Sequence, residues 1–192
     1  MTIDAAFTQF PCLTTERLVL RRLQIEDAPA LFSIYSDEES MRYFGNNPQQ
    51  SLSDTEALIR RLQALYASRR SIRWGVAFKD SDTLIGTCSL HHFDEGYHCV
   101  QTGYDLNRTH WGKGIMTEAM LTVLNFGFTD LGVHRIEAII DIENERSRKL
   151  LLRLGFTYEG NLRQRYFERG IFEDEYYFGL LEDEWLANHF VD

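Results

Sequence analysis

Two glycines stand one residue apart in the stretch NRTHWGKGIMTE, residues 107–118, with a lysine between them and a helical pattern directly after them. The first turn of a helix has backbone amides without intrahelical acceptors and a partial positive charge, so it can bind an anion. Glycine at positions 112 and 114 lets a phosphate come close to these amides, and Lys113 adds positive charge. The stretch therefore predicts a pyrophosphate site at a strand-to-helix junction. A tight turn without a ligand is the alternative.

Two common nucleotide-binding loops do not match these letters. The Walker A loop needs the spacing G-x-x-x-x-G-K-[ST], and WGKGIM lacks both that spacing and a hydroxyl residue after the lysine. The dinucleotide-binding pattern G-x-G-x-x-G needs a third glycine where Thr117 stands, and it opens a βαβ unit that is not found in this sequence. Neither kind of nucleotide-binding enzyme is indicated.

Composition and charge narrow the function classes. At 192 residues the chain is long enough for one substantial hydrophobic core, and 44% apolar residues are typical of a packed globular protein. The 20 Lys and Arg against 29 Asp and Glu give a formal net charge of −9, which argues against binding to nucleic acid or to an anionic membrane surface. The start of the chain lacks a signal-peptide pattern, and no run approaches the ~20 apolar residues of a membrane span, so we expect a cytoplasmic protein.

The cysteines carry no metal or disulfide pattern. Cys12, Cys88 and Cys99 are odd in number and have no C-x-x-C spacing, so neither a disulfide framework nor a zinc site is expected. We interpret them as reduced, structural residues. Cys99 as a nucleophile is the alternative, but no base can be identified beside it in the sequence.

Apolar periodicity and turn formers predict both strands and helices. The helix that ends near residue 70 has Ser53 and Glu56 at capping-box spacing, and Gly155 ends the helix ERSRKLLLRLG. The expected elements, in order, are a strand at 18–20, a helix carrying Ala30 to Tyr35, a helix at about 53–70, two strands around the turn 80–82, a strand ending near Leu106, a helix at 115–128, a strand at 134–141, a helix at 145–154, and two last strands in FTYEG and IFEDEYYFGLL. This order describes one α/β or α+β domain with a largely central sheet.

Three blocks of the sequence, taken together and in this order, resemble the GNAT superfamily of acyl-CoA N-acetyltransferases: GYDLNRTHWGKGIMTEAM, IENERSRKLLLRLGF and EGNLRQRYFERGIFEDEYYFGLLEDEW. The segment LTTERLVLRRLQIEDAPALF and the C-terminal block resemble the Rim-type ribosomal-protein N-terminal acetyltransferase branch. The resemblance implies a single N-acetyltransferase domain over residues 1–192, with a recognisable core from about Leu13 to Trp185. It also implies an α/β (α+β) GNAT-like fold with a central mixed, mostly antiparallel sheet flanked by helices, and acetyl-CoA as co-substrate without a metal.

The loop pattern of this family, R/Q-x-x-G-x-G/A, falls on residues 109–114, where Thr109 replaces the usual Arg or Gln and Arg108 is its neighbour. We expect this departure to weaken rather than abolish cofactor binding, because the loop amides bind the phosphates. The resemblance also implies that Leu106 lies beside the pantetheine arm and that Asn144 faces the cofactor, although Asn144 is also a good helix N-cap. The expected cofactor-binding residues are Leu106, Arg108, Thr109, Trp111, Gly112, Lys113, Gly114, Ile115, Met116 and Asn144.

Acetyl transfer from a thioester to an amine needs an unprotonated amine, a donor to the carbonyl oxygen and a proton for the departing thiolate. Many relatives place a glutamate base where this chain has Gln101, and a tyrosine acid where it has Leu151. Ser147, at a family position that faces the cofactor, is the candidate catalytic proton donor, with a plain surface helix position as the alternative. The candidate bases remain open: Asp105, Asp141, His91 and His92.

The resemblance implies an amine acceptor in a cleft bordered by acidic and aromatic side chains. The acidic candidates, which a solvated surface would explain equally well, are Glu38, Glu39, Asp94, Glu95, Glu173, Asp174 and Glu175, and the aromatic candidates are Tyr166, Phe167, Phe172, Tyr176 and Tyr177. A protein N-terminal α-amine and a small molecule such as a polyamine, amino sugar or aminoglycoside both remain open. Because Gln101 and Leu151 replace both usual proton-transfer groups, a non-catalytic acyl-CoA-binding module is the third alternative. We expect a monomer or a homodimer.

Overall fold

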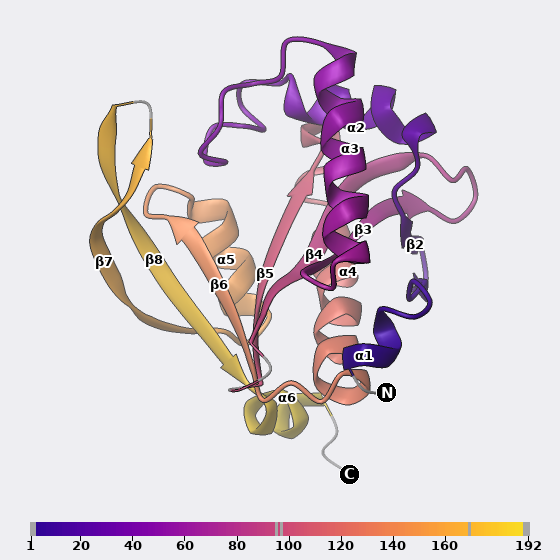
Figure 1. Ribbon diagram of the computed structural model, residues 1–192. Helices are drawn as coiled ribbons and strands as arrows, with labels where there is room; N and C mark the ends of the chain where they lie inside the picture. The colour runs from indigo at the N-terminus through magenta and orange to yellow at the C-terminus, as the bar shows by residue number, and fades with distance from the viewer. Residues whose placement is uncertain (1–2, 95, 97, 169, 190–192) are drawn as a thin grey trace.

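The computed structural model describes residues 3–94, 96, 98–168 and 170–189. The helices (Figure 1) are α1 (Ile3–Ala6), α2 (Ala28–Tyr35), α3 (Leu52–Ala67), α4 (Ile115–Asn125), α5 (Glu145–Arg153) and α6 (Glu182–His189). Shorter turns are η1 (Ile25–Asp27), η2 (Arg108–His110) and the π-turn η3 (Phe126–Asp130). The strands are β1 (Leu13–Thr14), β2 (Leu18–Arg22), β3 (Ser71–Phe78), β4 (Leu84–Asp94), β5 (Cys99–Leu106), β6 (Arg135–Asp141), β7 (Thr157–Glu168) and β8 (Ile171–Leu181).

The strands form one mixed sheet in the order β1-β2-β3-β4-β5-β6-β8-β7. All neighbours pair antiparallel except β5 and β6, which are parallel. α4 lies in the connection between these two strands, because a parallel pair needs a crossover. The predicted fold, a central and mostly antiparallel sheet flanked by helices, is confirmed.

The parallel pair is short, and its two strands then diverge (Figure 1). Pairing covers only Cys99–Thr102 on β5 and Arg135–Ala138 on β6. Beyond it β5 continues to Leu106 and β6 to Asp141, and within the described chain the two facing edges form no ladder with each other there. The sheet is therefore split in its middle, and backbone edges border the split on both sides.

Different helices cover the two faces of the sheet. On one face α2 and α3 bury Leu31, Ile34 and Ile59 in a core of their own. On the other face α4 packs in a larger core, which includes Val100 of β5 and Phe178 of β8. Apolar burial is the main stabilising term in a domain of this size. Because the larger core draws on strands from both sides of the split, it holds the two halves of the sheet together.

The capping box of α3 differs from the predicted one. The helix begins at Leu52, so the predicted cap Ser53 already lies inside it. Ser51 takes the role instead: its hydroxyl accepts from the Asp54 amide (3.3 Å), and the Asp54 carboxylate accepts from the Ser51 amide (3.0 Å). The predicted partner, Glu56, forms an ion pair on the helix surface (3.1 Å). The sequence contains two possible capping pairs, Ser51 with Asp54 and Ser53 with Glu56, and the predicted pair lies two residues too late.

Other differences lie at the ends of elements. The helix predicted to reach residue 128 leaves α geometry after Asn125 and continues as the π-turn η3. β7 is much longer than FTYEG, and the sequence analysis did not identify β1, α1 or α6. No helix in the described part of the chain is long and apolar enough to cross a membrane.

Candidate active site

The glycine loop, residues 107–114, connects the end of β5 to the start of α4. Gly112 and Gly114 have φ angles of +74° and +72°, in the left-handed region that favours glycine. The amides of residues 112–117 donate hydrogen bonds to none of the described residues, because they belong to the loop and to the first helical turn. A Cβ added at Gly112 would project into open space. Free donors, a helix N-terminus and room for a ligand together fit a phosphate group.

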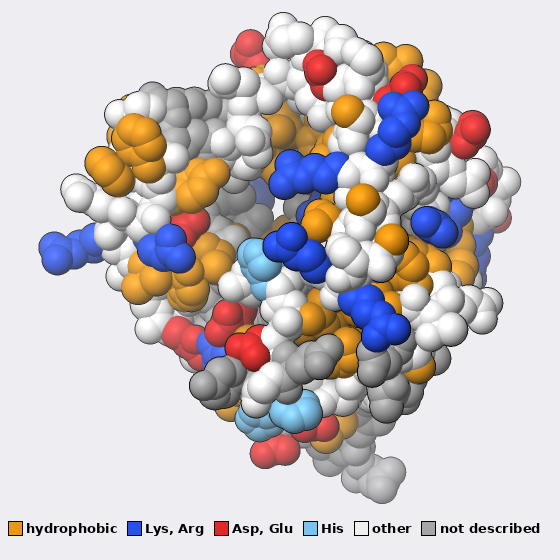
Figure 2. Space-filling model, viewed as in Figure 1, with side chains coloured by type: hydrophobic (Ala, Val, Ile, Leu, Met, Phe, Trp, Pro, Cys, Tyr) orange, Lys and Arg blue, Asp and Glu red, His pale blue; other side chains and the backbone are white. Residues whose placement is uncertain are grey.

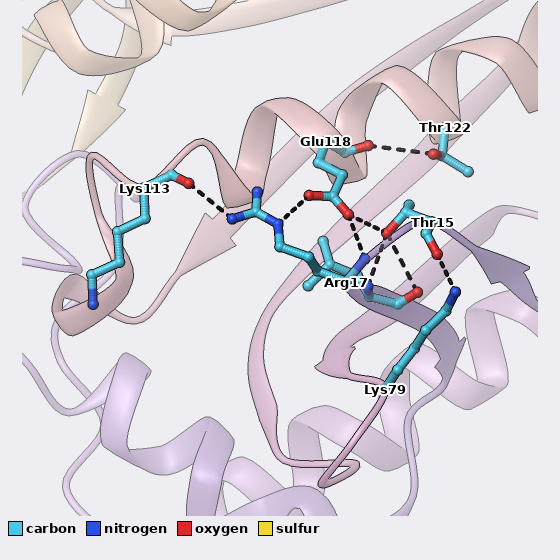
Figure 3. A network of polar contacts seen from close by, with 7 residues as sticks. Thr15, Arg17, Lys79, Lys113, Glu118 and Thr122 are labelled. Carbon is cyan, nitrogen blue, oxygen red and sulfur yellow. Dashed lines mark hydrogen bonds and ion pairs between the residues drawn. The ribbon is translucent and has the colours of Figure 1, made fainter.

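A polar network anchors this loop and α4 to the chain just before β2 (Figure 3). The Glu118 carboxylate accepts from the Arg17 Nε (2.6 Å), from the Arg17 amide (2.9 Å) and from the Thr15 hydroxyl. The Arg17 Nη1 also donates to the Lys113 carbonyl (3.2 Å), and the Lys79 ammonium donates to the Thr15 carbonyl. The Lys113 ammonium points away from the network. The network thus fixes the backbone of the glycine loop from one side.

Glu118 contributes a charge to this anchor. Burial alone would raise the pKa of Glu118, but the hydrogen bonds from Thr15 and Arg17 outweigh burial and hold the pKa below its ordinary value. The carboxylate is therefore ionised at neutral pH. Because the Arg17 side chain is 45% exposed, solvent screens the pair, and its contribution to stability is about 1 kcal/mol or less.

Trp111 fixes the first half of the loop. Its indole Nε1 donates to the Leu106 carbonyl (2.8 Å), and the Arg146 guanidinium lies 4.0 Å from its ring centroid. The Asn107 Oδ1 accepts from the amide (3.1 Å) and the hydroxyl (2.8 Å) of Thr109. Thr109, at the position of the family's Arg or Gln, therefore holds the turn through Asn107.

A cavity of about 360 Å³, called here the α4–α5 cavity, opens beside the glycine loop. The predicted cofactor-binding residues that line it are Leu106, Trp111, Gly112, Gly114, Ile115, Met116 and Asn144. Arg108, Thr109 and Lys113 do not line it. Arg108 instead lies 3.5 Å from the Asp37 carboxylate. The cavity thus gathers most of the predicted set, from the loop, α4 and α5.

Sequence reasoning missed a basic face of α5. Arg146, Lys149 and Arg153 all line the α4–α5 cavity. Their spacing of three and four residues places them on one side of a helix, and this signal is present in ERSRKLLLR. Basic residues near a helix C-terminus also interact favourably with the helix dipole, so the pattern alone does not indicate a phosphate site.

A second cavity of about 400 Å³, the β5–β6 cavity, lies in the split of the sheet. Its walls include residues 101–104 of β5, 138–141 of β6 and 173–175 of β8, together with the segment 42–45. Figure 2 shows the surface hollowed between β5 and the β7–β8 hairpin, with Lys or Arg and His side chains at the rim. The diverging strands therefore create a pocket that is open to solvent.

The β5–β6 cavity carries charges of both signs. Asp141 and Glu175 are register partners on β6 and β8, and both line the cavity. Burial raises the pKa of Glu175, Arg165 opposes this rise, and Asp141 adds to it. Arg42 and Arg73 line the same cavity. A cationic amine would therefore find its carboxylate partners on the β6–β8 side.

The acidic and aromatic candidates for this cleft separate into two groups. The candidates that line the β5–β6 cavity are Glu173, Asp174, Glu175 and Tyr166. Glu39 lines the α4–α5 cavity, and Glu95 lies outside the described residues. Phe167 and Phe172 are each 60% exposed on the β7–β8 hairpin, where they contact each other. The remaining candidates, Glu38, Asp94, Tyr176 and Tyr177, do not line the cleft.

Asp105, one of the candidate bases, is part of a buried network. Its side chain is 1% exposed and accepts hydrogen bonds from Tyr35 (2.8 Å), Arg73 (3.3 Å) and both the amide (3.0 Å) and the hydroxyl of Thr87. Burial raises its pKa, while Arg73 and the hydrogen bonds lower it. Asp105 lines the α4–α5 cavity but not the β5–β6 cavity, and its lone pairs already have donors. It therefore does not directly face an amine bound in the β5–β6 cavity.

The two histidines lie on β4 beside Gln101 of the neighbouring strand β5. His91 lines the β5–β6 cavity, and burial, with a nearby arginine, lowers its pKa to about 3. His92 does not line this cavity, and its Nδ1 lies 2.7 Å from the Gln101 Oε1. Gln101 does line it and also donates to Glu137 (3.4 Å). Of the four candidate bases, the cavity therefore contains His91, as a weakly basic neutral ring, and Asp141.

The two cavities meet. Tyr43, Phe44, Tyr104, Asn144 and Ser147 line both of them. The expected capping role of Asn144 is also present, since its Oδ1 accepts from the Ser147 amide (3.1 Å) at the start of α5. Asn144 thus caps α5 and also lines the junction of the two cavities. Leu151, at the usual acid position, is fully buried in the core.

The cysteines carry no sign of reactivity. Burial raises the pKa of Cys99 to about 11, so its thiol stays protonated at neutral pH. Cys88 is fully buried, and burial raises its pKa as well. Cys12 is exposed, and all three thiols are free. Among the described residues, no group of three or more His, Cys, Asp or Glu side chains is placed to hold a metal ion.

Several proteins of similar sequence are named as N-acetyltransferases. An uncharacterised N-acetyltransferase of Bacillus subtilis (strain 168), YoaA, is 38% identical over 161 residues, which cover 84% of this chain and 91% of that protein. The [ribosomal protein uS5]-alanine N-acetyltransferase of Escherichia coli (strain K12) is 27% identical over 182 residues, covering 90% and 92%. The spermidine N(1)-acetyltransferase of the same strain is 24% identical over 170 residues, covering 88% and 89%.

Solved structures share the fold. A GNAT-family acetyltransferase from Bacillus anthracis superposes with a TM-score of 0.81 at 25% identity, covering 90% of this chain and 99% of that one. A spermidine N-acetyltransferase from Vibrio cholerae, solved in complex with CoA and spermine, superposes with a TM-score of 0.76 at 24% identity, covering 88% and 98%. A family model described as an acetyltransferase (GNAT) domain matches residues 17–157. This chain therefore belongs to the GNAT family of N-acetyltransferases and is an acyltransferase.

Proposed function

We propose that this enzyme transfers the acetyl group of acetyl-CoA to a primary amine. One observation carries the proposal: the α4–α5 cavity, with its free loop amides, and the β5–β6 cavity, with its carboxylates, meet at shared residues. Substrates in two adjoining cavities have their reacting atoms close together, and such proximity supplies a large part of the rate enhancement. The CoA in the similar Vibrio cholerae structure supports this choice of acyl donor.

The residues of the α4–α5 cavity suit CoA. The amides of residues 112–117 would hold its pyrophosphate, and Arg146, Lys149 and Arg153 supply positive charge for its phosphates. The free edge of β5, as far as Leu106, offers backbone groups to the amides of the pantetheine arm. Three predicted cofactor-binding residues do not line this cavity. We assign to Arg108 and Lys113 a contribution of positive charge, and to Thr109 the shaping of the turn.

Ser147 is the proposed proton donor to the thiolate that leaves. It lines both cavities, and the hydrogen bond from its amide to Asn144 (3.1 Å) fixes its position. Leu151, where relatives have a tyrosine, offers no proton and lies in the core. A positioned acid of this kind contributes about 10²- to 10⁴-fold to the rate.

The favoured acceptor is the α-amine of a polypeptide N-terminus. Gln101 cannot act as a base, and burial keeps the pKa of His91 at about 3, which leaves Asp141 as the remaining candidate base in the cavity. An amine that is already neutral makes the least demand on such a base. An α-amine, with a pKa of about 7.7–8.0, is partly neutral at pH 7, whereas an alkyl amine near ~10.4 is almost wholly charged. The similar enzyme named for the alanine of ribosomal protein uS5 supports this acceptor class.

A small amine with several positive charges is the second candidate. Asp141, Glu173 and Glu175 line the β5–β6 cavity and would attract such a molecule. The similar spermidine N(1)-acetyltransferase supports this alternative. The acceptor amine, in either case, takes the β5–β6 side of the junction.

Mass spectrometry after incubation with acetyl-CoA separates the two acceptor classes, with peptides that have a free α-amine and polyamines as the panel. For an α-amine acceptor, kcat/KM should rise with pH along the titration of the substrate amine itself. A preference for lysine or polyamine amines at pH 7 would contradict the α-amine assignment. So would a pH profile that stays fixed when the substrate amine is changed.

The proposal also covers the extent of the domain, its location, its oligomeric state and its partners. We propose one N-acetyltransferase domain over residues 1–192, working in the cytoplasm as a monomer or homodimer without nucleic-acid or membrane partners. The net charge of −9 supports the last part. Sedimentation of the purified protein tests the oligomeric state.

A further inference from the structure

The hydroxyl of Tyr104 is buried at the junction of the two cavities. Its oxygen meets no partner with hydrogen-bond geometry among the described residues, and the nearby Ser147 side chain interacts with it only weakly. A buried hydroxyl without a partner costs about 1–3 kcal/mol. A folded chain that bears this cost places a free donor where something else can use it.

The position of Tyr104 indicates which group could accept a hydrogen bond from its hydroxyl. It lies on β5, two residues after Thr102, the last β5 residue that pairs with β6, so it stands where the sheet splits. Its side chain packs against the larger core and lines both cavities. The other hydroxyl of this junction that the proposed chemistry uses, on Ser147, is assigned to the leaving sulfur. The carbonyl oxygen of the thioester gains charge as the amine attacks, and a side-chain donor beside Ser147 can stabilise that charge.

We propose that the Tyr104 hydroxyl donates a hydrogen bond to the thioester carbonyl oxygen and stabilises the charge that develops there. The inference rests on the proposed function and names a second residue for it. During the transfer the nitrogen–carbon bond forms and the carbon–sulfur bond breaks. The nitrogen loses one proton, the sulfur gains one from Ser147, and the proton released by nitrogen restores the Ser147 hydroxyl, while Tyr104 keeps its proton throughout. The step therefore needs no further reactant.

The electrostatics of Tyr104 keep its hydroxyl protonated. Burial raises its pKa to about 12, and an interaction with the Ser147 side chain opposes this rise only in part. The hydroxyl is therefore protonated at neutral pH and can donate a hydrogen bond.

The test is Tyr104→Phe, which removes only the hydroxyl. Loss of one preorganised donor to a developing oxyanion lowers kcat by about 10²- to 10³-fold. The dissociation constant for CoA, which has no acetyl carbonyl, should stay unchanged. Acetonyl-CoA, a ketone analogue that keeps the carbonyl but cannot transfer it, should bind about three- to tenfold more weakly, as for the loss of one neutral hydrogen bond. The melting temperature should change little, because the hydroxyl meets no partner with hydrogen-bond geometry among the described residues.

Tyr35→Phe is the matched control. The Tyr35 hydroxyl is also buried, but it donates to Asp105 (2.8 Å) and lines neither the α4–α5 nor the β5–β6 cavity. This variant should lose stability and keep its kcat. A Tyr104→Phe enzyme with wild-type kcat, or one that loses CoA affinity and stability along with kcat, would overturn the inference. Absence of acetyl transfer by the wild-type enzyme to every amine would instead overturn the proposed function.

Discussion

Gly112→Ala tests whether the glycine loop binds the pyrophosphate. Gly112 has φ +74°, and a Cβ there would meet no atom within 4 Å, so the substitution adds backbone strain without a clash. An L-residue in the left-handed region costs about 1–2 kcal/mol. For a chain of this length, such a loss lowers Tm by about 2–8 °C, since each kcal/mol corresponds to about 2–4 °C. The variant should therefore remain folded at 25 °C.

Its affinity for CoA should fall much further than its stability. The added methyl group occupies the open space in front of the loop amides, where the phosphates would lie. Hydrogen bonds to charged groups contribute about 1.5–3 kcal/mol each, so the loss of one raises the dissociation constant about 10- to 100-fold. Isothermal titration calorimetry with CoA measures this constant directly, and thermal unfolding followed by circular dichroism measures the stability.

Gly132→Ala is the matched control for this experiment. Gly132 also has a positive φ, +67°, and open space at its Cβ, but it lies outside both cavities. The two variants should lose similar stability, and only Gly112→Ala should lose affinity. Wild-type affinity for CoA in a folded Gly112→Ala protein would refute the phosphate site. Equal loss of affinity in both variants would show that strain alone explains the effect.

Three further predictions follow from the site. Ser147→Ala should lower kcat by about 10²-fold or more with little change in the KM for acetyl-CoA, and full activity in steady-state assays would exclude Ser147 as the proton donor. Lys149→Gln combined with Arg153→Gln should weaken CoA binding and flatten its dependence on salt concentration; an unchanged dependence in titrations at several ionic strengths would remove these residues from the phosphate site. Glu118→Gln should lower stability by about 1 kcal/mol at pH 7. Because the pKa of Glu118 is below its ordinary value of 4.5, this difference from wild type is present above that pH and is lost as the pH falls through the folded pKa. A difference in unfolding free energy that persists unchanged in acid would contradict the proposed anchor.

Local sequence patterns predicted the position of the glycine loop and of the helix that borders the site. The spacing of Gly112 and Gly114 before an apolar helical repeat located the loop, and both residues have the left-handed backbone that such a turn needs. The helix in ERSRKLLLRLG followed from periodicity and from Gly155, and it brought Asn144 and Ser147 to the junction. These features depend on neighbours within a few residues, which is the range over which sequence patterns are informative.

Features that depend on distant residues could not be predicted in the same way. Where β5 and β6 stop pairing depends on the packing of strands about 35 residues apart, and no local pattern marks Thr102 as the last paired residue. The burial of Asp105 depends on donors from α2, β3 and β4, which the sequence does not show as neighbours. The free hydroxyl of Tyr104 is visible only once its surroundings are known, since CVQTGYDL alone gives no reason to separate it from a core aromatic.

A crystal structure of the enzyme with bound CoA tests the central claim most directly. The two-cavity arrangement predicts the pyrophosphate within hydrogen-bond distance of the amides of residues 112–117 and the thiol at the junction beside Tyr104 and Ser147. A pyrophosphate bound elsewhere, or a thiol directed away from the β5–β6 cavity, would contradict it.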